Sequence, residues 1–313
     1  MTVRYALMSV SVVRGGLEES RHQVHVAVAG ADGELVAWHG DSQRLTTLRS
    51  AAKPFQAEPL VASGALEAFG FDDETLAVCC ASHAGTDAHV AAVRRGLDAA
   101  GVDAERLRNT TGSVEQRLRH NCSGNHLAFL ALSAHLGWRL DGYWEPSHPS
   151  QRAAQASVAD AAGMAADDIA TCSDGCGVVC FALPLATIAA MYARLPGLLP
   201  RQYAAMRSHP EMIAGDGDLD TELMRALDGA VAKGGAEGLG CVGLSAAGIG
   251  IAVRAEDGAE RAVAPALIDV LSQLLGWERP PGALDGFAQP ALRNSPGDVV
   301  GFLRARVPLT RVS

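Results

Sequence analysis

Two lysines are the residues of this sequence whose type and placement most directly suggest chemistry. The 313-residue chain contains 26 Lys and Arg residues, of which only Lys53 and Lys233 are lysines. Arginine keeps its proton near neutral pH and cannot act as a base, whereas a desolvated lysine can. Two lysines in such an arginine-rich chain are therefore candidates for proton transfer. The alternative is that both are leftover surface residues.

Lys53 ends a Ser-x-x-Lys tetrapeptide that begins at Ser50 and is followed by Pro54. If this segment opens a helix, the two side chains lie on one face, about 5 to 6 Å apart at Cβ, and the amine can reach the hydroxyl. Pro54 fits only a first helical turn, where its missing N–H breaks no hydrogen bond. The backbone N–H groups of such a turn favour a developing serine alkoxide. The alternative is a serine N-cap with an incidental lysine.

Two further segments could contribute to the same chemistry. The triplet Lys233-Gly234-Gly235 precedes a predicted strand at 238–244, as a Lys-x-Gly triplet beside a sheet edge does in serine acyl-transferase sites. It could instead cap a preceding helix. Ser82 follows an apolar run that ends at Cys80, which predicts a strand end where a hydroxyl is exposed on a rigid support. An ordinary turn serine is the alternative.

The cysteines are seven in number, an odd count that argues against a disulfide framework and favours reduced thiols. Cys122 and Cys176 each lie beside polar and glycine residues rather than in an apolar stripe. The i, i+4 spacing of Cys172, Cys176 and Cys180 could suggest a metal cluster. Glycines within that segment break the helix that would align them, so this interpretation is not favoured.

The elements that must position these residues are predicted from periodicity and turn signals. Strands are expected at 22–29, 34–39, 238–244, 248–255, 260–263 and 299–307. Helices are expected at 86–100, 126–136, 151–162, 184–195 and 266–275. We therefore expect one domain over residues 1–313, with a sheet lobe from both chain ends (about 1–48 and 234–313) and a mainly helical middle (about 49–233).

The overall composition excludes several classes of function. The net charge is −9 and no Lys/Arg cluster with interleaved aromatic residues is present, which argues against nucleic-acid binding. No apolar run reaches membrane-spanning length, so no membrane partner is expected. The first residues lack a clear signal-peptide cleavage site, and we expect a cytoplasmic protein.

Taken in order, the motifs resemble those of the asparaginase II family (Rhizobium-type L-asparaginases). The motifs are Glu19-Ser20-Arg21-His22, Arg49-Ser50-Ala51-Ala52-Lys53-Pro54-Phe55-Gln56, Ala81-Ser82-His83-Ala84-Gly85, Asn121-Cys122-Ser123-Gly124, Asp174-Gly175-Cys176-Gly177 and Lys233-Gly234-Gly235-Ala236-Glu237-Gly238. The resemblance implies a mixed α/β fold like that of serine β-lactamases and glutaminases, with an antiparallel sheet flanked by helices and a helical lobe. It also implies hydrolysis of L-asparagine to L-aspartate and ammonia, usually by a homodimer.

The resemblance also implies two Ser-Lys pairs, Ser50 with Lys53 and Ser82 with Lys233. We expect Ser50 to attack the amide while neutral Lys53 takes its proton, and an exchange of roles between Ser50 and Ser82 stays open. Arg49, Asp174 and His126 lie inside the motifs and are candidate substrate-binding residues. Alternative functions are a glutaminase, another small-amide serine hydrolase, or a non-catalytic ligand-binding member of the family.

A zinc cofactor is also implied by the resemblance, with Cys122, Cys176 and a lysine as ligands. This chain has Asn125 in place of that lysine, and an amide oxygen is a poor zinc ligand, so we expect a weak or empty site with the two thiols as neighbours. The chain also departs from the family pattern at residues 108–110 and 178–180.

Overall fold

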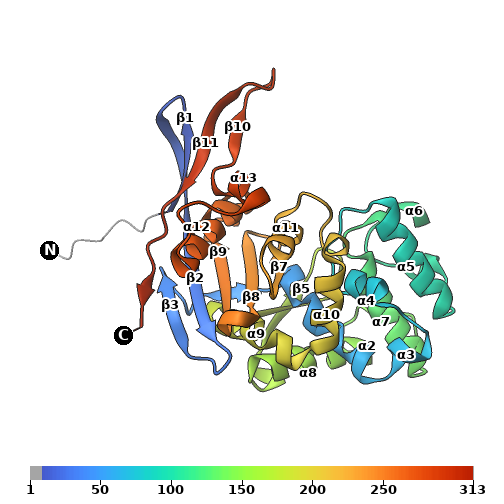
Figure 1. Ribbon diagram of the computed structural model, residues 1–313. Helices are drawn as coiled ribbons and strands as arrows, with labels where there is room; N and C mark the ends of the chain where they lie inside the picture. Colours follow the sequence, from blue (N-terminus) through green and yellow to red (C-terminus); the bar gives the residue numbers. More distant parts are fainter. Residues whose placement is uncertain (1–8, 313) are drawn as a thin grey trace.

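A large antiparallel sheet forms one lobe of the molecule (Figure 1). The computed structural model describes residues 9–312 of the chain. The sheet combines strands from both chain ends, because the two amino-terminal strands lie between carboxyl-terminal ones. The strand order is β10 (Ala291–Arg293), β11 (Val299–Ala305), β1 (Ser9–Arg14), β2 (Leu17–Gly30), β9 (Ile249–Ala255), β8 (Leu239–Leu244) and β7 (Ala230–Gly235). Two further strands lie off this path: β3 (Leu35–His39) pairs with β2, and β12 (Thr310–Arg311) pairs with β3.

Two helices cover opposite faces of this sheet, α9 (Leu185–Leu198) and α12 (Val263–Leu275). Gly250 of β9 allows α9 to approach closely, since a Cβ there would lie only 1.9 Å from a carbonyl oxygen of α9. On the other face, a Cβ at Gly240 of β8 would lie 2.5 Å from Val263 of α12. The glycines of these strands therefore set how near the helices lie to the sheet.

The second lobe is mainly helical and lies beside the β7 edge of the sheet (Figure 1). Its centre is α7, whose residues 123–133 are all buried. The helices of this lobe are α1 (Lys53–Gln56), α2 (Glu58–Ala62), α3 (Ala65–Ala68), α4 (Asp73–Cys79), α5 (Asp87–Ala99), α6 (Val114–Arg119), α7 (Ser123–His135), α8 (Pro149–Ala162) and α10 (Pro200–Ser208). Further elements are α11 (Leu219–Ala226), α13 (Asp285–Ala288) and a small sheet of β4 (Leu45–Thr47), β6 (Val179–Pro184) and β5 (Ala170–Ser173).

The structure confirms the predicted fold class, an antiparallel sheet flanked by helices with a helical lobe. The amino-terminal hairpin, the helix that begins after Thr86 and the closing strand near residue 300 are all present. No helix within residues 9–312 has the length and apolar character needed to cross a membrane.

Two predicted strands are wrong. The apolar run that ends at Cys80 belongs to helix α4, because the Asp72 side chain accepts a hydrogen bond from Thr75 N at 2.8 Å and caps a helix there. Its inner residues are buried on every side, so the run shows no alternation that separates strand from helix. The segment 260–263 is a 3-10 turn leading into α12, and its buried Ala262 and Val263 begin the face that covers the sheet.

Candidate active site

Lys53 is buried at the junction of two short helices. A 3-10 helix, η1 (Arg49–Ala52), runs directly into α1, with Pro54 in the first turn as predicted. The Lys53 side chain is only 3% exposed and reaches across to the loop after α4. Its Nζ lies within hydrogen-bond distance of four acceptors, Ala81 O at 2.7 Å, Ser82 Oγ at 2.9 Å, Cys122 Sγ at 3.3 Å and Asn121 O at 3.4 Å.

Ser82 lies in the extended loop between α4 and α5. Its backbone N–H donates to Ile213 O at 2.9 Å, which fixes the loop against the segment that precedes α11. The hydroxyl is partly accessible and receives the hydrogen bond from Lys53. A serine hydroxyl is thus in contact with a buried amine.

Lys233 lies within β7, the edge strand of the large sheet, and the predicted strand that follows it is β8. It is 1% exposed, and its Nζ donates to Gly234 O at 2.8 Å and lies 3.5 Å from Asp220 Oδ2. The same carboxylate oxygen accepts the Gly234 N–H at 2.6 Å. Burial lowers the pKa of Lys233, Asp220 opposes this shift, and the charge of Lys53 adds to it.

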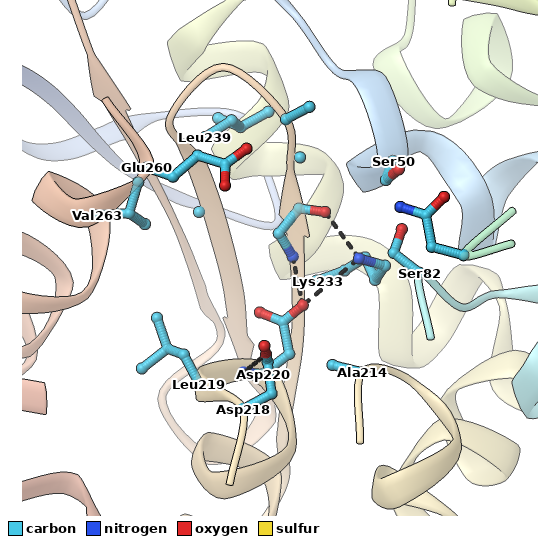
Figure 2. A pocket seen from close by; sticks show the side chains of 15 residues that line it. Ser50, Ser82, Ala214, Asp218, Leu219, Asp220, Lys233, Leu239, Glu260 and Val263 are labelled. Atoms are coloured by element: carbon cyan, nitrogen blue, oxygen red, sulfur yellow. Dashed lines mark hydrogen bonds and ion pairs between the residues drawn. The ribbon is translucent and has the colours of Figure 1, made fainter. Parts of the chain in front are cut away.

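A pocket of about 280 Å³ opens between the sheet edge and the helical lobe. Figure 2 shows Ser50 and Ser82 on one side of it, Lys233 between them and the β7 strand, and the side chains of α11 below. The polar side chains that line the pocket are Ser50, Ser82, Asn121, Asp218, Asp220, Lys233 and Glu260. Three are carboxylates and none is an arginine. Burial raises the pKa of Asp218, and the neighbouring Asp220 acts in the same direction.

The pairing of serines and lysines differs from the expected one. Lys53 is hydrogen-bonded to Ser82, and within the described residues 9–312 no hydrogen bond joins Lys53 to Ser50. Likewise no hydrogen bond joins Lys233 to Ser82 in that part of the chain; Lys233 pairs with Asp220. The reason is geometric, because the Lys53 side chain extends away from its own helical turn towards the next loop.

The residues expected to bind substrate are not among those that line the pocket. Arg49 Nε donates to Asp174 Oδ2 at 2.8 Å, so these two charges neutralise each other. His126 is fully buried in α7, and its Nδ1 lies 2.5 Å from Tyr143 Oη. Sequence reasoning instead missed the carboxylates of the pocket. The only signal for Asp218 was its position before a helix, where its side chain accepts from the backbone N–H of Asp220.

Residues 10–305 match the sequence model of a known protein family, described as L-asparaginase II. The chain belongs to this family. No curated protein sequence matches it.

The solved structures that match this member of the L-asparaginase II family are only distantly similar to it. The native form of a protein called Mglu has a TM-score of 0.45 and 15% identity, over 81% of this chain and 64% of Mglu. The match thus covers less than two thirds of Mglu. A β-lactamase from Mycobacterium bovis has a TM-score of 0.40 and 16% identity, over 80% of this chain and 94% of that one.

The thiols expected to hold zinc in this family member, Cys122 and Cys176, are free and buried neighbours. The hydrogen bond from Cys176 lowers the pKa of Cys122, with the charge of Lys53 acting in the same direction against the effect of burial. The same hydrogen bond, together with burial, raises the pKa of Cys176.

The donor set does not fit a structural or catalytic zinc site. Protein zinc sites use at least three nitrogen, sulfur or carboxylate ligands. Within residues 9–312 no group of three His, Cys, Asp or Glu side chains is arranged to hold a metal ion. Asn125 is fully buried, and among the residues that the structure describes neither polar atom of its amide has a hydrogen-bond partner.

Proposed function

We propose that this chain hydrolyses the side-chain amide of L-asparagine to L-aspartate and ammonia by serine-lysine catalysis. The observation that carries the proposal is the meeting of both lysines of the sequence with two serines. Ser50, Ser82 and Lys233 line one pocket, and Lys53 lies directly behind Ser82. Family membership supports amide hydrolysis as the type of reaction.

The contact between Ser82 and Lys53 supplies the proton transfer that the nucleophile needs. Their separation of 2.9 Å lies within the range over which a base can remove a hydroxyl proton. When Lys53 is an ammonium it donates in this hydrogen bond. When Lys53 is neutral the direction reverses, and the serine hydroxyl donates to the amine.

Hydrolysis then proceeds in two stages. The serine Oγ bonds to the side-chain carbonyl carbon of L-asparagine, and its proton moves to neutral Lys53. The carbon–nitrogen bond breaks, and the lysine returns that proton to the leaving nitrogen, which departs as ammonia. Water attacks the resulting β-aspartyl ester and gives one proton, through Lys53, to the departing serine oxygen.

Ser50 is the second candidate nucleophile. It lines the same pocket and lies in the helical turn that leads into α1, where N–H groups favour an alkoxide. If Ser50 attacks, its proton reaches Lys53 through the Ser82 hydroxyl. The two assignments predict different effects of removing the Ser50 hydroxyl. Only the assignment with Ser50 as the nucleophile requires that hydroxyl for turnover.

Recognition of the substrate is assigned to the charged lining of the pocket. The carboxylates of Asp218 and Glu260 favour the α-ammonium group of an amino acid, and Lys233 is the lining cation available to its carboxylate. L-Glutamine is the runner-up substrate, because one extra methylene changes discrimination by only about 1–3 kcal/mol.

Ammonia release from L-asparagine, L-glutamine and simple aliphatic amides tests the proposal. We expect the highest kcat/KM with L-asparagine, and Ser82→Ala should lower it by about 100-fold or more. Ser50→Ala separates the two nucleophile assignments. Thr46→Val, a change at a buried hydroxyl on β4 away from the pocket, serves as a control. Equal turnover by Ser82→Ala and the unmodified protein would remove the serine-lysine mechanism.

We also propose, from the resemblance, that the protein is a cytoplasmic homodimer. Sedimentation equilibrium measures the association state directly. A single species at the monomer mass of 32.5 kDa over the whole concentration range would contradict this part of the proposal.

A further inference from the structure

A second hollow, of about 420 Å³, lies outside the catalytic pocket. It is lined by residues 108–112, Arg117 and residues 175–177, and it shares no lining residue with the catalytic pocket. None of these residues is a carboxylate. The lining contains instead two arginines, Arg108 and Arg117. Its charge is thus opposite to that of the catalytic pocket.

The two arginines lack carboxylate partners. Within residues 9–312 neither forms an ion pair, although nearby Arg106 and Arg119 both do. The Arg108 guanidinium lies over the Trp144 ring, 4.2 Å from its centroid, which holds it in place without neutralising it. Arg117 donates from Nη1 to Glu105 O at 2.8 Å. Asp103, Glu105 and Asp141 line an adjoining hollow that shares both arginines, but within residues 9–312 none of them forms an ion pair with Arg108 or Arg117, so both guanidiniums remain available to an anion.

Hydrogen-bonding groups without partners at the hollow also indicate that it binds a ligand. The Nε of Arg117 is buried and has no hydrogen-bond partner within residues 9–312. Asn109 is 3% exposed and donates from Nδ2 to Arg117 O at 2.9 Å, while its Oδ1 also lacks a partner in the described part of the chain. Unsatisfied buried polar atoms cost free energy, so a native site that contains them is usually completed by something else.

We propose that this hollow is a second binding site, which takes a small dicarboxylate. Each guanidinium is a planar fork that matches one carboxylate in a bidentate arrangement, and two such forks suit two carboxylates. The proposal goes beyond the hydrolytic function and does not rest on it.

The site is connected to the catalytic pocket by contacts already described. Cys176 lines the hollow and shares a hydrogen bond with Cys122. Cys122 in turn lies 3.3 Å from Lys53. A bound dicarboxylate is therefore separated from the amine of the proposed site by one pair of thiols.

Titration of the full-length protein with succinate, followed by calorimetry and by tryptophan fluorescence, tests the proposal. We expect saturable binding of one succinate, weaker at higher ionic strength. Arg108→Gln should raise Kd by about tenfold or more, since a charge-assisted hydrogen bond is lost. Arg117→Gln should act in the same way. Arg106→Gln is the matched control, because Arg106 is paired with Asp141 and does not line the hollow.

Comparison of succinate, L-aspartate and acetate tests whether the hollow requires two carboxylates on its ligand. Succinate and L-aspartate should both bind, whereas acetate, with one carboxylate, should bind at least tenfold more weakly. If Arg117→Gln unfolds because its contact with Glu105 is lost, Arg108→Gln decides the question. Equal Kd values for succinate in the unmodified protein and in Arg108→Gln, or no saturable binding, would overturn the proposal.

Discussion

At the scale of single residues, arginine and lysine have different roles in this chain. Arginine supplies the surface cations of this chain, and the two lysines are 3% and 1% exposed. A buried ammonium is costly unless it has close partners. Lys53 has oxygen and sulfur acceptors, and Lys233 has a carboxylate and a carbonyl. Such positions are expected where a group must be able to change its protonation state.

The pair formed by Lys233 and Asp220 gives the first prediction. Lys233→Met leaves a buried carboxylate without its cation and should lower the free energy of unfolding by about 3–5 kcal/mol. Adding Asp220→Asn to that variant should restore part of the loss, because no unpaired charge then remains. Urea unfolding of the two single variants and the double variant measures the coupling. Strictly additive effects would show that the two charges do not stabilise each other.

Asn125 gives a second prediction, which concerns zinc. Because the donor set does not fit the metal, purified protein should hold less than one zinc per chain and lose it to a chelator while staying folded. Asn125→Lys supplies a third donor beside the two thiols and should raise zinc affinity. Asn125→Leu, of similar size without a donor, is the control. Tightly bound zinc in a one-to-one ratio in the unmodified protein would contradict this account.

At the scale of elements, close helix contacts depend on glycines within helices. A Cβ at Gly124 of α7 would lie 1.9 Å from the backbone oxygen of Val78 in α4. These two helices present Cys122 and the loop that carries Ser82, so their separation sets the geometry around Lys53.

Gly124→Ala is therefore expected to destabilise the protein by at least about 1–3 kcal/mol, since overpacking forces the helices apart. The matched control is Gly197→Ala in α9, where a Cβ meets nothing within 4 Å. That change should be neutral or stabilising by up to about 1 kcal/mol. Thermal unfolding of both variants provides the comparison, and similar melting temperatures would show that the close approach of α4 and α7 is not needed.

Some helices and strands were predictable from the sequence, whereas contacts between distant segments were not. The helix after Thr86 was predictable because its capping residue and apolar spacing agree, and the β2–β3 hairpin because a glycine-containing turn separates two apolar runs. The approach of Lys53 to Ser82 was not predictable, because the two residues meet through tertiary packing of α1 against the loop after α4. The same holds for Asp218 and Glu260, which come from distant segments and reach one pocket only in the folded chain.

At the scale of the whole molecule, buried histidines tie stability to pH. His83 is 2% exposed, stacks on His89 and lies 2.9 Å from Ser123 Oγ through its Nε2. Burial lowers the pKa of His83 to about 3, and the neighbouring His89 and Lys53 add to that effect. The unfolded chain has a histidine pKa of about 6.5, so between these values the unfolded state binds more protons than the folded one.

The contribution of His83 to stability is therefore complete above about pH 6.5 and is lost as the pH falls towards 3, by about 1.4 kcal/mol per pH unit. His83→Gln should make the loss of stability between pH 6.5 and pH 5 shallower by about 1.4 kcal/mol per pH unit. Urea unfolding of both proteins at these two pH values measures it. An unchanged pH dependence in the variant would show that His83 takes up its proton without unfolding.

The molecule as a whole combines a carboxylate-lined pocket that contains serines with a separate arginine-lined hollow, on a fold that joins a sheet and a helical lobe at the β7 edge. This arrangement keeps the proposed chemistry at the junction of the lobes. We propose that a serine there forms an ester with the substrate, while Lys53 accepts the serine proton and passes it to the leaving nitrogen.

Trapping of that ester by hydroxylamine tests the claim most directly. With L-asparagine and hydroxylamine, the unmodified protein should release ammonia and form β-aspartyl hydroxamate. Lys53→Arg, which keeps the positive charge but cannot act as a base, should lower both products by about 100-fold or more, and Lys53→Met, which removes the charge as well as the base, should do the same. Arg95→Lys, an exposed substitution, should leave both unchanged. Ammonia and hydroxamate formed by Lys53→Arg at the rate of the unmodified protein would contradict the account.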